Sequence, residues 1–424
     1  MAPRIGNFPA RSRSIASASA RTVLYGTWPC YDLGVSKRCW LILGIAVGLL
    51  ACRGARSTAL AEPDLGEGRI ESSVEEPVTG SSRFLDGLSW QLLVSSYYMF
   101  NAHRVAGPYN DLGYPYADAM GFGLVFAGGD VGYRADKWGL TMALRWGQNV
   151  DRLTEFAPLS LGYATWIPCK KLTLDLGYFD AFVGIENENE WKNPTFTRGI
   201  IYFRMQPFRH LGFRALIEPH DQVDITIIVA NGSIFGTRFP SDVADEVVAP
   251  AVGAQLRYTP GTSTDLRIGA VASPNGSDGN RNWQAIIDFI ASWAPGAWML
   301  FVDGDYEFSR KGTLTGLPVS KQWGVSLGGR YAISDDWSVG GRGEYFGASA
   351  GSEPGRQFTV TGTVRYAPVE YLIISLEPRA EFAENDIYFS RPFVTDPATG
   401  ETMPSLNKDW FFGFWIGVTA RLGN

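Results

Sequence analysis

Residues 138–147 read WGLTMALRWG, and this stretch shows the pattern that decides the fold. Large apolar side chains occupy every second position, and small or polar residues fill the positions between them. Successive side chains of an extended strand point to opposite faces, so one face of this segment is apolar and the other polar. Tryptophan stands at both ends of the apolar face, where a membrane-crossing strand meets the two lipid–water interfaces. The stretch predicts a transmembrane β-strand.

The same alternation recurs along the chain. Residues 322–331, 358–366 and 412–422 each carry an apolar residue or glycine at every second position, and no charged residue shares their apolar face. A membrane β-strand needs about 9–11 residues with one face toward lipid and the other toward a wet lumen. We therefore expect an all-β fold: a closed antiparallel transmembrane β-barrel.

Two kinds of connection separate the expected strands, and their order predicts the topology. Short turns rich in proline, glycine or polar residues fall at 134–137, 168–170, 219–221, 260–262, 295–296, 334–336 and 367–369. Longer polar connections fall near 102–118, 149–156, 181–207, 231–248, 274–280, 309–320, 348–356 and 384–409. Short and long connections alternate, which predicts about 16 strands with both termini on the short-turn side, the periplasmic side of such barrels.

The strand count depends on one assignment. The stretch from Arg198 to Gln206 is apolar enough to form a strand, but we assign it to the third long connection. The alternatives are 14 or 18 strands.

Composition excludes several classes of protein. There is no run of about 18 apolar residues, so no transmembrane helix is expected. The net charge of −6 and the absence of a basic cluster argue against a nucleic-acid partner. Of the four cysteines only Cys169 lies in the expected barrel, which excludes a disulfide framework.

The amino-terminal region has the features of an export signal. Two basic residues precede the apolar stretch 39–51, which is too short to span a bilayer. We favour cleavage after Ala61; the alternative is a lipidated Cys52, and a true start near Val35 is a further expectation. The expected parts are a targeting region 1–61, a disordered periplasmic tail 62–87 and the barrel 88–424.

The polar face of the expected wall carries charges of both signs. The predicted inward residues are Arg145, Arg214, Arg257, Arg267, Arg330, Arg342, Arg365, Arg379 and Arg421, beside Asp175, Asp303, Asp305, Glu307, Glu344, Glu377 and Glu381. Most of them are expected to form ion pairs that stiffen the wall. A barrel of about 16 strands leaves an aqueous channel, so its width indicates transport.

The third long connection, 181–207, is the candidate constriction of that channel. Folded into the lumen, it would set carboxylates against wall arginines and create a transverse field across the pore. The alternative is an exposed polar loop without a gating role. The candidate constriction residues are Glu186, Glu188, Glu190, Arg198, Arg204, Arg214, Arg257 and Arg267.

No catalytic or metal-binding pattern stands out. His103, His210 and His220 fall in or beside expected connections, and none has the spacing of a metal-ligand motif. No glycine-rich loop ends in the Lys-Ser or Lys-Thr of a phosphate site. We expect no enzyme activity, no cofactor and no metal.

Several short motifs follow one another from about Leu172 onward: Gly177-Tyr178-Phe179-Asp180, Asn193-Pro194 with Arg198, 207–212, 229–232, Glu344-Tyr345-Phe346 and Glu377-Pro378-Arg379. Their order resembles the outer-membrane β-barrel porin family known as porin-2. The chain departs from the family pattern at Tyr178, where lysine is usual, and at its end, Gly423-Asn424, where an aromatic residue is usual.

The resemblance implies a porin in the bacterial outer membrane that passes small hydrophilic solutes by passive diffusion. Its expected partners are outer-membrane lipid and the barrel assembly machinery. A homotrimer is one assembly that we consider. One alternative is a sealed barrel that serves as a surface adhesion or structural protein through connections 231–248 and 384–409. A second is a water-soluble β-sandwich or propeller whose apolar faces are buried in protein.

Overall fold

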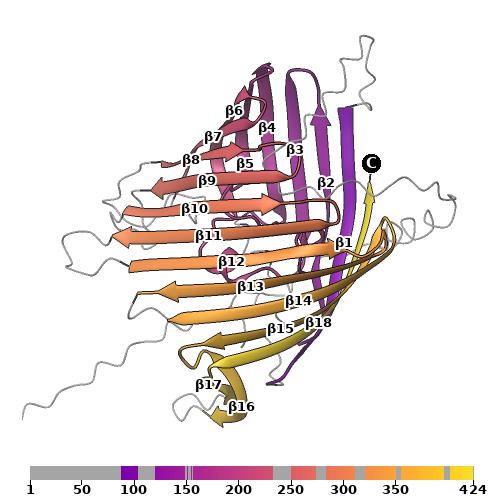
Figure 1. Ribbon diagram of the computed structural model, residues 1–424, viewed down its shortest axis with the longest axis vertical. Coiled ribbons are helices and arrows are strands. Elements are labelled where there is room, and N and C mark those ends of the chain that lie inside the picture. The colour runs from indigo at the N-terminus through magenta and orange to yellow at the C-terminus, as the bar shows by residue number, and fades with distance from the viewer. Residues whose placement is uncertain are drawn as a thin grey trace, which may run out of the picture. The chain divides into compact units, whose positions relative to one another are not determined.

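The computed structural model describes residues 87–103, 120–148, 150, 154, 156–232, 250–273, 283–310, 320–349, 355–395 and 402–423. They all belong to one compact unit, Leu60–Asn424. Across these residues sixteen strands form a closed antiparallel barrel, and two more form a separate hairpin (Figure 1). No helix among them is long and apolar enough to cross a membrane.

The barrel strands are β1 (Leu88–Asn101), β2 (Gly121–Arg134), β3 (Trp138–Trp146), β4 (Leu159–Cys169), β5 (Leu172–Asp180), β6 (Arg209–His220), β7 (Val223–Ala230), β8 (Ala251–Tyr258), β9 (Thr264–Ser273), β10 (Trp283–Trp293), β11 (Trp298–Arg310), β12 (Ser320–Ala332), β13 (Trp337–Ala348), β14 (Arg356–Val369), β15 (Leu372–Ala383) and β18 (Trp410–Gly423). The hairpin strands are β16 (Tyr388–Thr395) and β17 (Thr402–Lys408). Between β5 and β6 lie the 3-10 helix η4 (Glu190–Lys192) and the short helix α2 (Ile200–Arg204).

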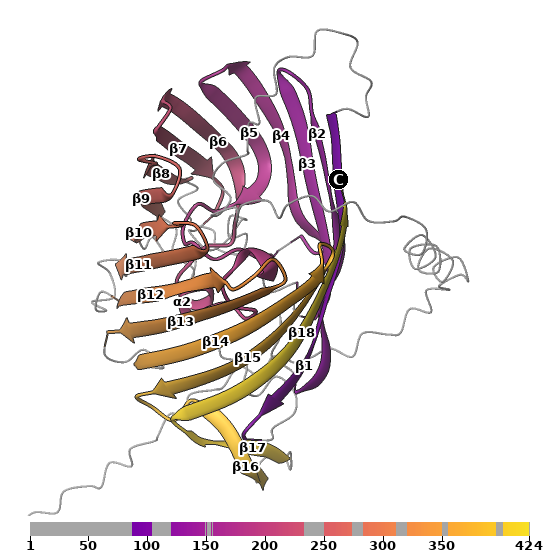
Figure 2. The same cartoon turned by 45° about the vertical axis from the view of Figure 1, so that its right-hand side comes forward.

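Neighbours in sequence pair with each other around almost the whole barrel. The exception is β15, which pairs with β18, because the β16–β17 hairpin occupies the connection between them. Figure 2 shows this hairpin beyond the ends of β15 and β18. Strand β1 pairs with β18 from Gln91↔Gly423 to Asn101↔Gly413, and this pairing closes the barrel.

The alternation predicted for residues 138–147 is present in β3. Trp138, Leu140 and Met142 are exposed on the outer face, whereas Ala143 and Arg145 are buried on the inner face. The barrel therefore exposes apolar side chains and buries polar ones, the reverse of a water-soluble protein. The alternative of a soluble sandwich or propeller is wrong, since it required these apolar faces to be buried.

Aromatic residues mark both ends of the outer wall. At the short-turn end Trp337 stacks on Tyr366 with ring centroids 4.5 Å apart, and Trp298 lies 4.6 Å from Tyr331. At the other end Trp146 is 52% exposed. These rings form the two girdles that hold a barrel at the membrane interfaces.

The predicted strand count and the alternation of short and long connections are confirmed. The stretch from Arg198 to Gln206 forms no strand and instead contains α2. The connection 384–409, predicted as a long polar loop, carries the β16–β17 hairpin. The targeting region 1–61 and nearly all of the tail 62–87 lie outside the described residues.

Candidate lumen constriction

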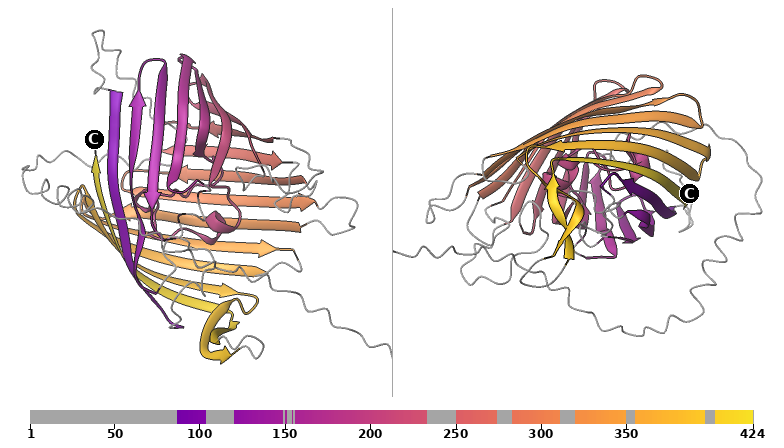
Figure 3. Two further views of the ribbon diagram at one scale, coloured as in Figure 1. Left: turned by 180° about the vertical axis from the view of Figure 1, so that it is seen from behind. Right: turned by 90° about the horizontal axis from the view of Figure 1, so that it is seen from below.

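Residues 181–208, the β5–β6 loop, fold into the barrel. Figure 2 shows α2 enclosed by the strand wall beside β12 and β13, and the view from behind in Figure 3 shows the same loop inside the lumen. Most side chains of the loop are buried. The loop therefore occupies the space that an exposed connection would leave to water.

An apolar contact holds one side of the β5–β6 loop. Ile200, Ile201 and Met205 are at most 1% exposed, and they pack against inward apolar residues of the wall, among them Val271 and Ile286. Such residues on the polar face of a strand would be costly in an open, wet lumen. Their presence follows from the loop that covers them.

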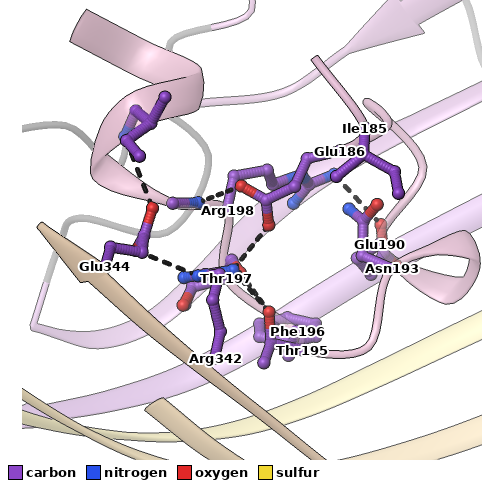
Figure 4. A network of polar contacts seen from close by, with 12 residues as sticks. Ile185, Glu186, Glu190, Asn193, Thr195, Phe196, Thr197, Arg198, Arg342 and Glu344 are labelled. Atoms are coloured by element: carbon purple, nitrogen blue, oxygen red, sulfur yellow. Dashed lines mark hydrogen bonds and ion pairs between the residues drawn. The ribbon is translucent and has the colours of Figure 1, made fainter. Parts of the chain in front are cut away.

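Arginines of β13 and β14 bind backbone carbonyls of another part of the loop. Arg342 donates to the carbonyl oxygen of Thr197 at 2.7 Å and to the hydroxyl of Thr195 at 2.5 Å (Figure 4). Arg365 donates to the carbonyl oxygens of Glu190 at 2.8 Å and Thr195 at 2.9 Å. Hydrogen bonds from charged donors are the stronger kind, so the wall holds this part of the loop in place.

Strand β15 adds a carboxylate and a third arginine to this contact. Glu377 accepts hydrogen bonds from the backbone N–H groups of Phe196, at 2.5 Å, and Thr197, at 2.9 Å. Arg379 donates to the carbonyl oxygen of Arg198 at 2.6 Å. Buried loop backbone must find partners inside the protein, and here the wall supplies them.

Glu186 is the loop carboxylate nearest the β13 wall. It forms an ion pair with Arg342 at 2.5 Å and accepts a hydrogen bond from the N–H of Gly199 at 2.6 Å. Burial raises the pKa of Glu186 to about 7, and the neighbouring Glu344 adds to the rise, whereas Arg342 opposes it. A Cβ at Gly199 would lie 2.0 Å from Oε1 of Glu344, so a larger residue there would have to displace that carboxylate.

Glu188 lies on the other side of the loop, toward β3, β4 and β6. It forms an ion pair with Arg209, lies 3.7 Å from Arg145 and accepts a hydrogen bond from Ser160 at 2.7 Å. Burial raises the pKa of Glu188, but Arg209 and Arg145 outweigh burial and hold it below the ordinary value. The pKa values of two acids that are two residues apart are therefore shifted in opposite directions.

The remaining loop candidates face different partners. Glu190 pairs with Arg198 within the loop at 3.5 Å and accepts a hydrogen bond from Thr419 on β18. Arg204 lies over the ring of Phe346, 5.4 Å from its centroid. These two arginines therefore belong to the packing of the loop.

The predicted pairing of the loop acids with Arg214, Arg257 and Arg267 is wrong. Arg214 binds Asp175 at 2.8 Å, while Arg257 and Arg267 both bind Asp265, at 2.8 and 2.6 Å. These carboxylates stand on the wall close to the arginines, so each arginine already has a local partner. The loop acids instead meet arginines of β3, β6 and β13.

The strand alternation predicts inward positions for two of the true partners, Arg145 and Arg342, but does not connect them to the loop. Arg209 lies within the motif 207–212 and is not among the predicted inward residues. Its position as the first residue of β6, directly after the loop, was the signal that could have identified it. The first residue of a strand that follows an inward loop lies at the rim of that loop's contacts.

A cavity lies between the β5–β6 loop and the wall. Its lining includes Glu186, Glu188, Arg209, Gln255 and Arg267. The Gln255 side-chain amide donates to the carbonyl oxygen of Phe182 at 2.7 Å and ties the cavity rim to β8. Of the three predicted wall arginines, only Arg267 shares this cavity with the loop acids.

A family model described as "Putative beta-barrel porin-2, OmpL-like" matches residues 87–405. The chain belongs to this porin family. The match covers β1 to β15 of the strand wall and the β5–β6 loop, and it confirms the resemblance that the motif order indicated. Together with the closed barrel, membership identifies this porin as a bacterial outer-membrane channel protein. A comparison with curated proteins finds no match.

Solved structures of outer-membrane channels share the fold of this porin. The anion-selective porin from Comamonas acidovorans is 10% identical, with a TM-score of 0.56 over 79% of this chain and 99% of that one. OmpT of Vibrio cholerae is 12% identical, with a TM-score of 0.52 over 79% and 97%. The channel DcaP of Acinetobacter baumannii is 11% identical, with a TM-score of 0.50 over 78% and 96%. At these identities the likeness concerns the barrel and not the solute.

Proposed function

We propose that this porin passes small hydrophilic solutes by passive diffusion and that its β5–β6 loop forms the constriction. The observation that carries the proposal is the ion pair between Glu186 of the loop and Arg342 of the far wall, at 2.5 Å. A loop held across the lumen narrows it, and a narrow polar opening selects solutes by size and charge. Glu188 and Arg209 extend this polar opening toward β6.

The cavity beside the loop gives the solute path its chemistry. Acidic and basic side chains line it together, with Glu186 and Glu188 on the loop and Arg267 on the wall. Opposed charges of this kind order water across the opening and favour small polar solutes over apolar ones.

The orientation of the barrel and its assembly belong to the same proposal. The short turns and both described chain ends lie at one end of the barrel, which we assign to the periplasm. One of the similar structures is a trimer form of OmpT from Vibrio cholerae, and we propose a homotrimer for this porin as well. The exposed apolar wall then contacts lipid, after insertion by the barrel assembly machinery.

Conductance in planar bilayers tests the channel. Purified, refolded protein is expected to give stepwise open-pore currents. A closed barrel migrates differently in detergent gels before and after boiling. Complete absence of current from protein that passes this test would contradict the proposal. It would favour the sealed barrel, in which the β16–β17 hairpin and connection 231–248, of which only 231 and 232 are described, act at the surface.

Cysteine modification tests the constriction itself. Asn187 lines the cavity between loop and wall, so Asn187→Cys places a thiol in the proposed path. A charged methanethiosulfonate reagent is expected to lower the conductance of Asn187→Cys. Wild type treated with the same reagent is the matched control, because its free Cys169 lies in an exposed position at the end of β4. Equal conductance before and after labelling of the variant would contradict the constriction.

A further inference from the structure

Three buried carboxylates meet on the inner face of β10 and β11. Asp288 stands directly opposite Asp305 in the strand register, and Asp303 follows on the same face of β11. Asp288 is 0% exposed, Asp303 2% and Asp305 4%. One oxygen of each lies within 4.8 Å of the others. Asp303 and Asp305 are among the inward residues predicted from the sequence, whereas Asp288 is not, and the sequence predicted no metal.

No cation among the described residues forms an ion pair with this acidic triad of Asp288, Asp303 and Asp305. Their hydrogen-bond donors among the described residues are neutral: the N–H of Gly184 at 3.4 Å, the N–H of Ile185 at 3.1 Å and the side-chain amide of Gln206. By contrast, Asp175, Asp265, Glu344 and Glu381 of the wall each form an ion pair with an arginine. Three buried like charges at this separation repel each other strongly unless a positive charge or protons intervene.

Two neutral oxygens beside the acidic triad point independently to a ligand. Ser326 of β12 stands directly opposite Asp303 on the same inward face, and its hydroxyl is buried without a hydrogen-bond partner. Gln206 is 3% exposed, and its amide group touches Asp303 and Asp305, yet its oxygen has no partner. One oxygen of each triad carboxylate is likewise without a donor. Buried acceptors are normally paired, so five unpaired oxygens at one place require an explanation.

We propose that Asp288, Asp303 and Asp305, with Ser326 and Gln206, bind a divalent cation of the Ca²⁺ type. The available donor atoms are oxygens only, which suits a hard cation and not Zn²⁺. Ca²⁺ accepts six to eight oxygens in irregular geometry, so carboxylates, a hydroxyl, an amide and water can share it.

The cation would fasten the β5–β6 loop to the β10–β12 wall. Gln206 belongs to the loop, and so do the N–H groups of Gly184 and Ile185 that contact Asp288 and Asp303. Rotation of the Gln206 amide exchanges its nitrogen for its oxygen at the acidic triad, a change that leaves its shape unaltered. Cation binding on this side complements the arginine contacts that hold the loop to β13–β15.

Calorimetry on the whole refolded porin in detergent tests the site, with CaCl₂ as the titrant after treatment with EDTA. Wild type is expected to bind one Ca²⁺ per chain. Asp303→Asn should weaken binding by at least the ~10–100-fold that loss of an outer-shell partner costs at other metal sites. Glu307→Gln is the matched control: it removes one charge from the same face of β11, but Glu307 lies outside the acidic triad and bonds Gln284 at 2.9 Å.

Each outcome decides the proposal. Full binding in Glu307→Gln with weak binding in Asp303→Asn supports it. Absence of binding to wild type overturns it and leaves shared protons as the neutralising charge, and equal binding in wild type and Asp303→Asn also overturns it. If Asp303→Asn shows no heat-modifiable barrel, Ser326→Ala takes its place with the same expected direction. The readout is independent of conduction, so a porin that fails to conduct leaves this test intact.

Discussion

Arg365 provides the sharpest test of how the wall holds the β5–β6 loop. The variant Arg365→Leu removes the two hydrogen bonds to the carbonyl oxygens of Glu190 and Thr195, at 2.8 and 2.9 Å, and a longer one to Trp191 at 3.4 Å. A hydrogen bond from a charged donor contributes about 1.5–3 kcal/mol, so the two short ones contribute about 3–6 kcal/mol. The variant also removes the cost of burying the guanidinium, which favours the lower end, about 3 kcal/mol.

A loss of about 3 kcal/mol raises the population of the undocked loop about 100-fold. Hydrogen exchange followed by mass spectrometry measures this directly, since amides of a locally opened segment exchange in proportion to that population. Peptides that cover 189–199 should exchange about 100-fold faster in Arg365→Leu, while strand peptides of β10 and β11 should not change. Planar-bilayer recordings of the variant should show more current noise than wild type.

Arg330→Leu is the matched control for this experiment. Arg330 is also an inward arginine, on β12, and within the part of the chain that the structure describes its side chain forms no hydrogen bond or ion pair with the β5–β6 loop. The two variants therefore lose the same charge but differ in loop contacts. If the loop amides exchange at the same rate in both variants, the reasoning about Arg365 is refuted.

Three further predictions concern pH and the lipid face. Because the docked loop raises the pKa of Glu186 from its ordinary value of 4.5 to about 7, protonation of Glu186 favours docking, and this contribution of about 3 kcal/mol falls away as the pH rises from 4.5 to about 7. Loss of docking should appear as faster hydrogen exchange of the loop amides between pH 4.5 and 7, and Glu186→Gln should lack this increase. The same pH profile in wild type and Glu186→Gln would contradict the role of Glu186. The pKa of Glu188 is lowered, so its contribution is present above pH 4.5 and is lost in acid; Glu188→Gln should abolish only the acid-side rise. Met142→Arg, midway between the two tryptophans of β3, should lower the free energy of unfolding from bilayers in urea by about 2–4 kcal/mol, whereas Met142→Leu should cost less than half of that.

The strand wall could be predicted from the sequence because the information is local. Each barrel strand alternates with a period of two, and the side that bears Trp138, Leu140 and Met142 is the exposed side in the structure. Turn residues mark where each strand ends. The inward positions of Arg342 and Glu377 followed from the same period.

The contacts of the β5–β6 loop could not be predicted in the same way. Glu186 meets Arg342 and Phe196 meets Glu377, pairs that are 156 and 181 residues apart in sequence. The period of a strand states which face a side chain is on but not which part of the wall a loop will reach. The arginines predicted to pair with the loop acids lie on β6, β8 and β9, whereas β13–β15 provide most of the contacts to the loop.

The inward isoleucines were a signal that could have shown where the loop goes. Ile286 and Ile290 of β10 share the inner face with Asp288, and each is fully buried. An apolar residue on a lumenal face predicts that protein, not water, covers it. The same strand carries Asp288, which is not among the predicted inward acids.

The sequence by itself determined the barrel, its strand number, the direction of its apolar face and the family, because alternation and turn chemistry act between residues close together in the chain. Only the tertiary structure decided which charges neutralise each other in the lumen, since those pairs form where the β5–β6 loop meets distant strands. It also decided that Asp288, Asp303 and Asp305 stand together with no described cation beside them, because strand register, and not sequence spacing, brings β10 and β11 face to face.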